Sequence, residues 1–306
     1  MPLLLLFGGL LLALPHLVYP VLALDLLLWG LFAMALDLLL GYVGLLSFGH
    51  AAFWGTSAYT SALLAKAGLP FPLAVLGGVG VTTLLATAIG FLSIRRQGIY
   101  FAMVTLAFAQ MVYYIANELR SLTGGENGVQ GVPRTLWGLD LSSPLAFYYA
   151  ALPLVALGFF LAWRTVRSPF GHVLIAVREE EARAQALGYP TTRFKFLAFL
   201  LSAGLSALAG GLYALNHGFV ALEVVHWSTS GLVVMMAILG GIGTLWGGLL
   251  GAAVVLLLRD WLSAWTDAWG VATGIIFVLV VLGFRQGIWG SLIRMWQHRR
   301  QAIPKS

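Results

Sequence analysis

The sequence predicts an all-α membrane protein that crosses the bilayer many times. Of its 306 residues, 60% are hydrophobic and only 9% are charged, whereas soluble domains carry about 25% charged residues. A soluble chain this apolar could not cover its surface with polar groups, but a chain surrounded by lipid does not need to. Stretches near the roughly 20 apolar residues that cross a bilayer recur along the chain. We therefore expect about ten transmembrane or half-membrane helices in one transmembrane domain, residues 1–306.

The composition argues against several other classes of protein. The sequence contains no cysteine, which excludes disulfides and thiolate chemistry. The formal net charge is +6, and in a membrane protein basic residues fix orientation, so we expect no nucleic-acid partner. The six histidines are scattered and the carboxylates do not cluster within a span, so we expect no metal site and no catalytic residues.

Nine apolar stretches account for the expected membrane segments. The first lacks the basic residues of a cleaved signal, because no Lys or Arg precedes Lys66, and we interpret it as a membrane helix. A polar segment, residues 118–144, carries glycine-rich turn chemistry and is expected to be an external loop. Residues 164–195 form a charged cytoplasmic loop, and residues 285–306 form a basic cytoplasmic tail. The stretches are residues 3–19, 21–40, 44–65, 71–94, 98–117, 145–163, 196–216, 228–258 and 270–284.

The distribution of basic residues predicts the orientation. With a cytoplasmic amino terminus, only four of the 17 Lys and Arg residues lie outside, namely Lys66, Arg120, Arg134 and Arg259. Lys and Arg are enriched in cytoplasmic loops, so this topology is strongly preferred, and both termini are expected to be cytoplasmic.

Glycines divide the stretch 228–258 into two parts. Its 31 residues give about 46 Å of helix, which is too short for two full crossings of a core about 30 Å thick. A single crossing would place the basic tail outside. We therefore expect two short helices or a re-entrant hairpin. Non-helical backbone at depth requires cover by protein or by a water-filled cavity, so Gly240, Gly241 and Gly243 are candidates for a translocation pathway.

Polar groups in the third stretch are the other pathway candidates, because polar groups inside a membrane are expensive and often line functional cavities. They are Ser47, Gly49, His50 and Tyr59. For His50, a hydrogen bond to a neighbouring helix is a slightly stronger alternative to substrate contact. The small residues of this stretch fit close helix packing and a broken helix equally well.

Two acidic residues elsewhere are expected to have a structural partner or to be solvated. Asp37 lies near the inner end of the second stretch, where a structural partner or interfacial water is the favoured interpretation. Glu223 belongs to the external rim, where we expect a solvated side chain, with pairing to basic residues of another protein as the alternative.

The cytoplasmic loop contains a short predicted helix. Glu180, Ala184 and Leu187 or Gly188 recur at helical spacing, and Gly188 and Pro190 give a stop signal. An ordinary solvated connector is one interpretation. The functional alternative is a coupling helix that docks into a groove of a soluble partner. The candidate coupling residues are Glu179, Glu180, Glu181, Ala182, Ala184, Leu187 and Gly188.

Four blocks of the sequence, in order, resemble the LivM family, one of the two permease subunits of branched-chain amino-acid ABC importers. The blocks are residues 41–64 (GYVGLLSFGHAAFWGTSAYTSALL), 98–132, 181–214 (EARAQALGYPTTRFKFLAFLLSAGLSALAGGLYA) and 239–250 (LGGIGTLWGGLL). The resemblance implies a single permease domain in a bacterial or archaeal plasma membrane. It implies as partners a homologous LivH-like permease, two ATPase subunits and an extracytoplasmic substrate-binding protein. It also implies that the cargo is a branched-chain or related small neutral amino acid.

ATP hydrolysis is expected on other chains. None of the three lysines, Lys66, Lys195 and Lys305, lies in a Gly-x-x-x-x-Gly-Lys-Ser/Thr phosphate loop. We therefore expect no cofactor on this chain and no enzymatic activity of its own, with ATP and Mg at the partner subunits. The alternative is an ATP-independent secondary transporter or channel for a small polar solute, which glycine-interrupted spans would also suit. Such a protein needs no docking helix, and Asp37 is only a weak candidate for proton coupling.

Overall fold

The protein is helical almost throughout. The computed structural model describes residues 2–265, 269–283 and 287–291. Six of the described helices are long and apolar enough to cross a membrane, which confirms the predicted all-α polytopic fold: α2 (Pro20–Leu40), α4 (Phe71–Ser93), α5 (Gly98–Glu118), α7 (Pro144–Val166), α10 (Thr191–His217) and α12 (Trp246–Ser263). Shorter apolar helices complete the bundle: α1 (Pro2–Leu17), α3 (His50–Lys66), α11 (Trp227–Gly240) and α13 (Trp269–Gly283). The basic residues of the predicted tail lie outside the described part of the chain.

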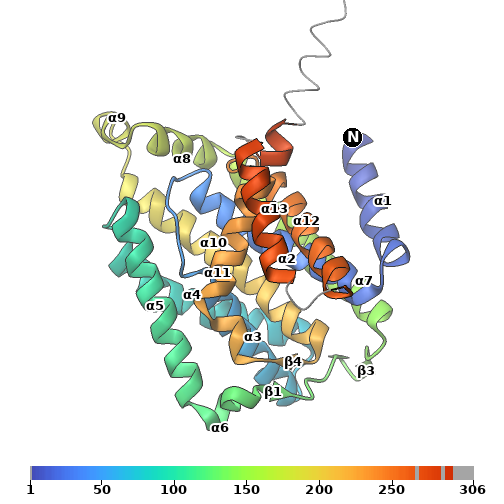
Figure 1. Cartoon of the computed structure of the whole chain (residues 1–306). Coiled ribbons are helices and arrows are strands. Elements are labelled where there is room, and N and C mark those ends of the chain that lie inside the picture. The colour runs from blue at the N-terminus through green and yellow to red at the C-terminus, as the bar shows by residue number, and fades with distance from the viewer. Residues whose placement is uncertain (1, 266–268, 284–286, 292–306) are drawn as a thin grey trace, which may run out of the picture.

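The helices run between two opposite ends of the molecule (Figure 1). One end carries α8 (Pro169–Glu179) and α9 (Glu181–Ala186), and α1 begins at this end (Figure 1). The other end carries α6 (Arg120–Thr123), the short 3-10 helices η1 (Gly125–Asn127) and η2 (Leu222–Val225), and four two-residue strands. We call these the loop-helix end and the strand end.

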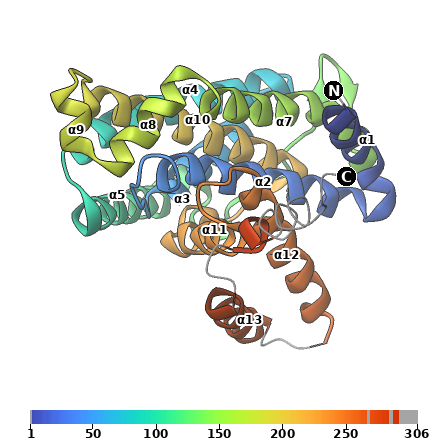
Figure 2. The same cartoon turned by 90° about the horizontal axis from the view of Figure 1, so that it is seen from above.

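Helix α2 is the most buried of the long helices. Apart from Asp25 and Asp37 it is apolar all round, and most of its residues are buried, whereas few residues of α5 are. A helix that is hydrophobic all round belongs in the interior, whereas the outward faces of the more exposed helices suit lipid. Helix α10 packs against α2, α3, α4 and α7, so α2 and α10 form the centre of the bundle. Helices α12 and α13 project from one side of this bundle (Figure 2).

The strand end is tied to the bundle by backbone pairing. Strand β1 (Val129–Gln130) runs antiparallel to β4 (Phe219–Val220), which follows α10. Strand β2 (Thr135–Leu136) pairs with β3 (Leu139–Asp140). Gly128 has a φ of +65°, and an added Cβ would collide with the carbonyl oxygen of Val220, so this close approach requires glycine. The predicted loop 118–144 is therefore ordered against the end of α10.

The third apolar stretch begins its helix later than predicted. Helix α3 starts at His50, whereas residues 41–49 are irregular. Gly44 has a φ of +81°, which ordinary helix does not allow. The irregular backbone is partly satisfied by hydroxyl groups, since Thr105 Oγ1 accepts from Phe48 N–H at 3.2 Å and Ser47 Oγ accepts from Gly49 N–H at 3.2 Å. The expected span at residues 44–65 is thus an irregular segment followed by a helix.

The glycine-split hairpin has the predicted form. Helix α11 ends at Gly240 and α12 begins at Trp246, so the break falls at the predicted glycines. Gly241, Gly243 and Leu245 all have positive φ, at 120°, 76° and 56°. Helix α11 has 14 residues, about 21 Å of helix, which is less than a full crossing. Helix α12 continues to Ser263, beyond the expected end at residue 258.

Candidate functional site

The loop between α7 and α10 folds into two short helices. Ser168 Oγ accepts from the N–H of Gly171 at 3.4 Å, and Pro169 occupies the first helical position, which together start α8. The backbone leaves helical geometry at Glu180, and α9 follows directly. Gly188 has a φ of +88°, which lets the chain turn back toward α10.

The predicted coupling residues divide into an outward and an inward set. The outward set is exposed: Glu179, Glu180, Ala182, Leu187 and Gly188. Ala184 is buried and Glu181 is half-buried. Glu181 Oε2 forms a 2.5 Å ion pair with Lys195 and accepts a 2.6 Å hydrogen bond from Gln97. Lys195 and Gln97 therefore hold α9 in place through Glu181, and the exposed residues form its free surface.

The exposed surface of this loop is apolar at its carboxyl-terminal end. Leu187 is 72% exposed, and Tyr189, which sequence reasoning did not select, is 44% exposed. Exposed apolar groups among charged ones are typical of protein-interaction sites. We call the exposed residues Glu179, Glu180, Ala182, Leu187, Gly188 and Tyr189 the docking surface.

The tip of the hairpin is held by a buried carboxylate. Asp37, at the end of α2, accepts hydrogen bonds from the N–H groups of Gly243 at 2.7 Å and Leu245 at 3.0 Å. Arg178, in the last turn of α8, donates to the carbonyl oxygen of Gly41 just beyond α2. The predicted structural role for Asp37 is confirmed, and the contact joins the docking loop to the hairpin tip through α2.

The pathway candidates of the third stretch are buried around the start of α3. His50 is fully buried, and its Nε2 lies 2.7 Å from Ser202 Oγ on α10. Ser202 Oγ in turn donates to the carbonyl oxygen of Ala35, so His50 has the predicted bond to a neighbouring helix. Ser47 is fully buried, and the Tyr59 side chain is almost fully buried. Close packing is present too, because an added Cβ at Gly55 would lie 2.5 Å from Val225. A role in transport for Ser47, Gly49, His50, Tyr59, Gly240, Gly241 and Gly243 stays a prediction.

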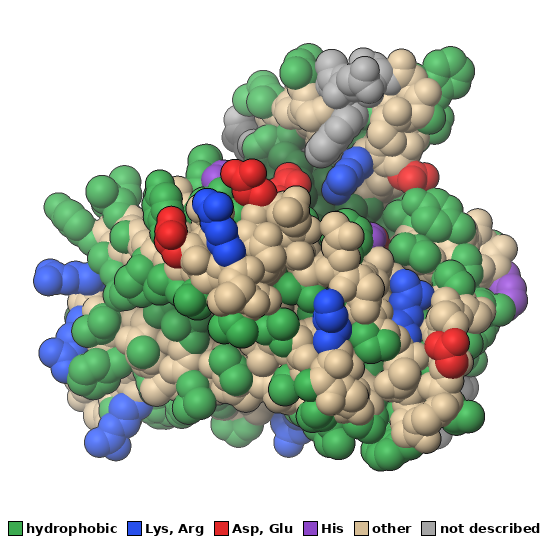
Figure 3. Space-filling model, turned by 90° about the horizontal axis from the view of Figure 1, so that it is seen from below, with side chains coloured by type: hydrophobic (Ala, Val, Ile, Leu, Met, Phe, Trp, Pro, Cys, Tyr) green, Lys and Arg blue, Asp and Glu red, His purple; other side chains and the backbone are tan. Residues whose placement is uncertain are grey.

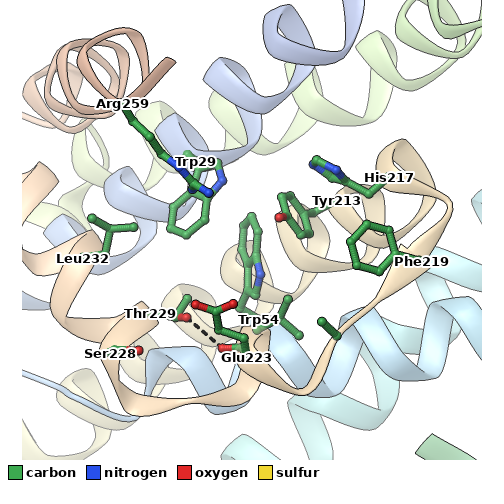
Figure 4. Close-up of a pocket in the computed structure, with 12 residues that line it drawn as sticks. Trp29, Trp54, Tyr213, His217, Phe219, Glu223, Ser228, Thr229, Leu232 and Arg259 are labelled. Atoms are coloured by element: carbon green, nitrogen blue, oxygen red, sulfur yellow. Dashed lines mark hydrogen bonds between the residues drawn. The ribbon is translucent and has the colours of Figure 1, made fainter. Parts of the chain in front are cut away.

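A second feature, which sequence reasoning did not assemble, is a cavity of about 530 Å³ near the strand end. We call it the outer cavity. Its wall combines an aromatic cluster of Trp29, Trp54 and Tyr213 with two charged side chains, Glu223 and Arg259. Figure 4 shows Arg259 entering from α12 and the Glu223 carboxylate entering from the opposite side. None of the predicted pathway residues lines this cavity.

The outer cavity lies toward the junction between α12 and the main bundle. Seen from the strand end, acidic and basic side chains lie along the junction between the projecting α12–α13 part and the rest of the protein (Figure 3). Within the residues that the structure describes, no group of three His, Asp or Glu side chains is arranged to hold a metal ion. The wall of the cavity presents charged and aromatic side chains.

A bundle of apolar helices with an irregular span and a glycine-split hairpin is the architecture of a polytopic membrane protein, and interrupted spans of this kind are typical of transporters. The chain belongs to the family described as "Branched-chain amino acid transport system / permease component", whose match covers residues 21–282. The resemblance to the LivM family is thereby confirmed.

Named relatives agree with this family. The high-affinity branched-chain amino acid transport system permease protein LivM of Salmonella typhimurium is 32% identical over 284 residues, covering 83% of this chain and 66% of the relative. LivM of Escherichia coli K12 is 30% identical with the same coverage. The autoinducer 2 import system permease protein LsrC of Escherichia coli O9:H4 is 28% identical over 247 residues, 75% of this chain and 68% of the relative. The chain thus matches just under two thirds of the length of the LivM proteins. No solved structure matches it.

Proposed function

We propose that this chain is one of two permease subunits of an ATP-driven importer for branched-chain or related small neutral amino acids. The observation that carries the proposal is the docking surface. Its charged residues are followed by exposed Leu187 and Tyr189 on a short, well-anchored helical loop. The names of the LivM relatives supply the cargo class.

The orientation in this proposal places the loop-helix end in the cytoplasm. Arg95 and Arg96 follow α4 and are exposed, as are Arg178 and Arg183 on α8 and α9. Helix α1 begins at the same end (Figure 1). Because basic residues are enriched on the cytoplasmic side, both termini are cytoplasmic and the strand end faces outward, in the plasma membrane of a bacterium or archaeon.

The partners in this proposal occupy the two ends and one side. Two ATPase subunits, which carry ATP and Mg, contact the transporter from the cytoplasm, and one of them receives the docking surface. A homologous LivH-like permease lies beside this chain in the bilayer. A substrate-binding protein delivers the amino acid at the strand end. This chain carries no ATPase site of its own and works as a transport subunit.

In this proposal, the contacts at the hairpin tip couple movement of the ATPase subunits to the membrane helices. The last turn of α8 holds the irregular segment after α2 through Arg178 and Gly41, and Asp37 holds Gly243 and Leu245. A movement of the docking surface therefore displaces the hairpin tip and the start of the irregular third segment together. These elements leave helical geometry near Gly44 and Gly241, where a few residues can absorb a change in backbone angles.

The alternative of an ATP-independent transporter rests on Asp37 as a proton-coupling group. Both carboxylate oxygens of Asp37 accept backbone hydrogen bonds, which fits a structural cap better. No observation on the described residues favours this alternative over the importer.

The test is affinity purification of the chain from native membranes in mild detergent, followed by mass spectrometry. Recovery of two ATPase subunits and a second permease, with ATP-dependent leucine uptake after reconstitution, is the expected result. Recovery of the chain alone, together with uptake that needs no ATP, would overturn the proposal.

A further inference from the structure

We propose that a groove between α4 and α7 binds an acyl chain of one anionic phospholipid, whose phosphate is held by Arg95 and Arg193. The groove has α10 as its floor and lies on the side of the bundle away from α13 (Figure 2). We call it the lateral groove. This inference goes beyond the proposed importer and uses the proposed function only for the orientation that places the loop-helix end in the cytoplasm.

The lateral groove has the size of one hydrocarbon chain in one leaflet. It is a cavity of about 550 Å³. It follows α10 from Leu197 to Leu208, about three turns, or about 16 Å, of helix. The apolar core of a bilayer is about 30 Å thick, so the groove matches the depth of a single leaflet. Its lining includes Leu76 and Thr83 of α4, Leu157 and Leu161 of α7, and Leu201 and Gly204 of α10.

The surface of the lateral groove suits hydrocarbon. Most of its lining residues are leucine, and none of the described ones is charged. Thr83 donates its hydroxyl to the carbonyl oxygen of Val79 at 2.7 Å, so this donor is satisfied within α4. The floor is open at Gly204, where an added Cβ would meet only Thr83 Oγ1, at 3.9 Å. An acyl chain can therefore lie in the groove without burying an unsatisfied donor of Thr83.

A second cavity adjoins the lateral groove at the loop-helix end. Its volume is about 310 Å³, it contains Arg95 and Arg193 in its lining, and Leu197 lines both cavities. We call it the basic pocket. Arg95 follows α4, and Arg193 lies in the first turn of α10. The two cavities together therefore form an apolar groove with two basic side chains at its cytoplasmic end.

The two arginines of the basic pocket have donors available. Both side chains are exposed, and within the described part of the chain neither guanidinium forms a hydrogen bond or an ion pair. Arg95 lies over the Phe91 ring at 5.3 Å, a contact with the face of the ring that leaves the N–H groups free. Glu181, which Gln97 ties to this connection, is already paired with Lys195. The positive charge of the pocket is therefore uncompensated by these neighbours.

An anionic phospholipid satisfies both cavities at once. A guanidinium holds phosphate oxygens through parallel hydrogen bonds. The cytoplasmic leaflet carries anionic lipids, and basic pockets between membrane helices on that side bind their headgroups. A zwitterionic lipid would bring its own cationic group toward two arginines and should bind more weakly. Soluble phosphate would leave the lateral groove unfilled.

The test measures binding of single lipids to the delipidated full chain by native mass spectrometry. The probes are phosphatidylglycerol, phosphatidylcholine with the same acyl chains, and inorganic phosphate. Phosphatidylglycerol should form one saturable adduct, more tightly than phosphatidylcholine, and phosphate should not displace it. Arg95→Gln and Arg193→Gln should each weaken phosphatidylglycerol binding about fivefold, the contribution of one basic residue at a membrane surface. Arg96→Gln, exposed on the same connection but absent from the lining of the basic pocket, is the matched control.

A second pair of variants tests the lateral groove. Gly204→Leu places a side chain on the groove floor and should weaken both lipids by the same factor, because they share their acyl chains. Gly80→Leu is the control, since Gly80 lies on α4 with open space around it and does not line the groove. Thermal unfolding of each variant checks that the fold is intact.

Several outcomes would overturn the lipid site. They are equal binding of the two lipids, an equal loss in Arg96→Gln, and displacement of phosphatidylglycerol by inorganic phosphate. Parental lipid binding by Arg95→Gln and Arg193→Gln, with loss of co-purifying ATPase subunits, would assign the basic pocket to the ATPase instead. Lipid binding is measured on the isolated chain, so failure of the importer to assemble would leave the site standing. A working importer without selective lipid binding would remove the site alone.

Discussion

Asp37 and Gly243 lie 206 positions apart in the chain, yet the Asp37 carboxylate accepts a 2.7 Å hydrogen bond from the Gly243 N–H. Its second oxygen accepts from Leu245 N–H at 3.0 Å, and Asp37 itself is fully buried. The hairpin tip contains three positive-φ residues, a conformation that the surroundings must hold in place. One carboxylate therefore fixes the turn between α11 and α12.

Replacing this carboxylate should destabilise the hairpin. Asp37→Ala leaves two backbone N–H groups without their acceptor, at about 1–3 kcal/mol each. Asp37→Asn keeps one carbonyl oxygen and should lose less. Thermal unfolding in detergent and protease cleavage at the hairpin tip measure the effect. The control is Asp140→Ala, because Asp140 also accepts a backbone N–H but on the exposed strand β3. Equal unfolding temperatures for Asp37→Ala and the parent would refute the role.

The positions of the spans could be predicted from the sequence, but their contacts could not. The length of each apolar stretch and the distribution of basic residues do not depend on tertiary structure, so the helix positions were predicted closely. The predicted start of α3 was wrong because the glycines and the serine between Gly41 and His50 fit both a helix and an irregular segment. The hydrogen bond between Asp37 and Gly243 depends on packing between distant segments, and a single sequence does not show which segments pack together.

The outer cavity was missed for a related reason. Trp29, Trp54 and Tyr213 come from α2, α3 and α10, and within each helix they are indistinguishable from core aromatics. Glu223 was interpreted as a solvated rim residue, and Arg259 was counted only as an external charge. The signal available in the sequence was that both are charged residues close to membrane segments. Only the tertiary structure places Glu223 of η2 and Arg259 of α12 around one cavity.

Close packing inside the hairpin gives a second prediction. An added Cβ at Gly251 would collide with the carbonyl oxygen of Met236, whereas Gly231 on α11 has open space. Gly251→Ala should therefore force α11 and α12 apart and lower the unfolding temperature. Gly231→Ala should be neutral or stabilising, because alanine is favoured over glycine in a helix by up to about 1 kcal/mol. Thermal unfolding in detergent compares the two. A stabilising Gly251→Ala would contradict the observed helix contact.

Glu181 and Glu180 should respond differently to neutralisation. Glu181→Gln leaves Lys195, which is only 5% exposed, without its carboxylate partner. Breaking a largely buried pair costs more than the 0–1 kcal/mol of an exposed pair, so the unfolding temperature should fall. Glu180→Gln alters an exposed side chain and should leave stability unchanged. Thermal unfolding of both variants is the measurement, and a similar loss in both would show that Glu181 has no special anchoring role.

The docking surface can be tested without altering the anchor. Glu180→Lys reverses a charge on this surface and should lower ATP-driven leucine uptake about tenfold, since a mismatched interfacial charge can cost 1.4 kcal/mol or more. Insertion and unfolding temperature should stay at the parental values. Arg96→Glu, an exposed charge reversal on the connection between α4 and α5 and outside the docking surface, is the control. Gly188→Trp should also reduce uptake. Gly188→Ala tests the strain at a φ of +88° alone, and unchanged uptake in Glu180→Lys and Gly188→Trp would defeat the docking proposal.

Arg178 should transmit movement rather than bind the ATPase. Its guanidinium donates to the Gly41 carbonyl, and an added Cβ at Gly44 would lie 3.2 Å from its side chain. Arg178→Gln shortens this link, so the ATPase subunits should co-purify at the parental ratio while ATP-driven uptake falls several-fold. Arg178→Lys, which keeps the charge but loses the fork of donors, should be intermediate. Arg96→Gln, on the exposed connection between α4 and α5, is the control. Loss of the ATPase subunits from Arg178→Gln would instead assign this residue to the docking contact, because a transmitting residue changes transport without changing assembly.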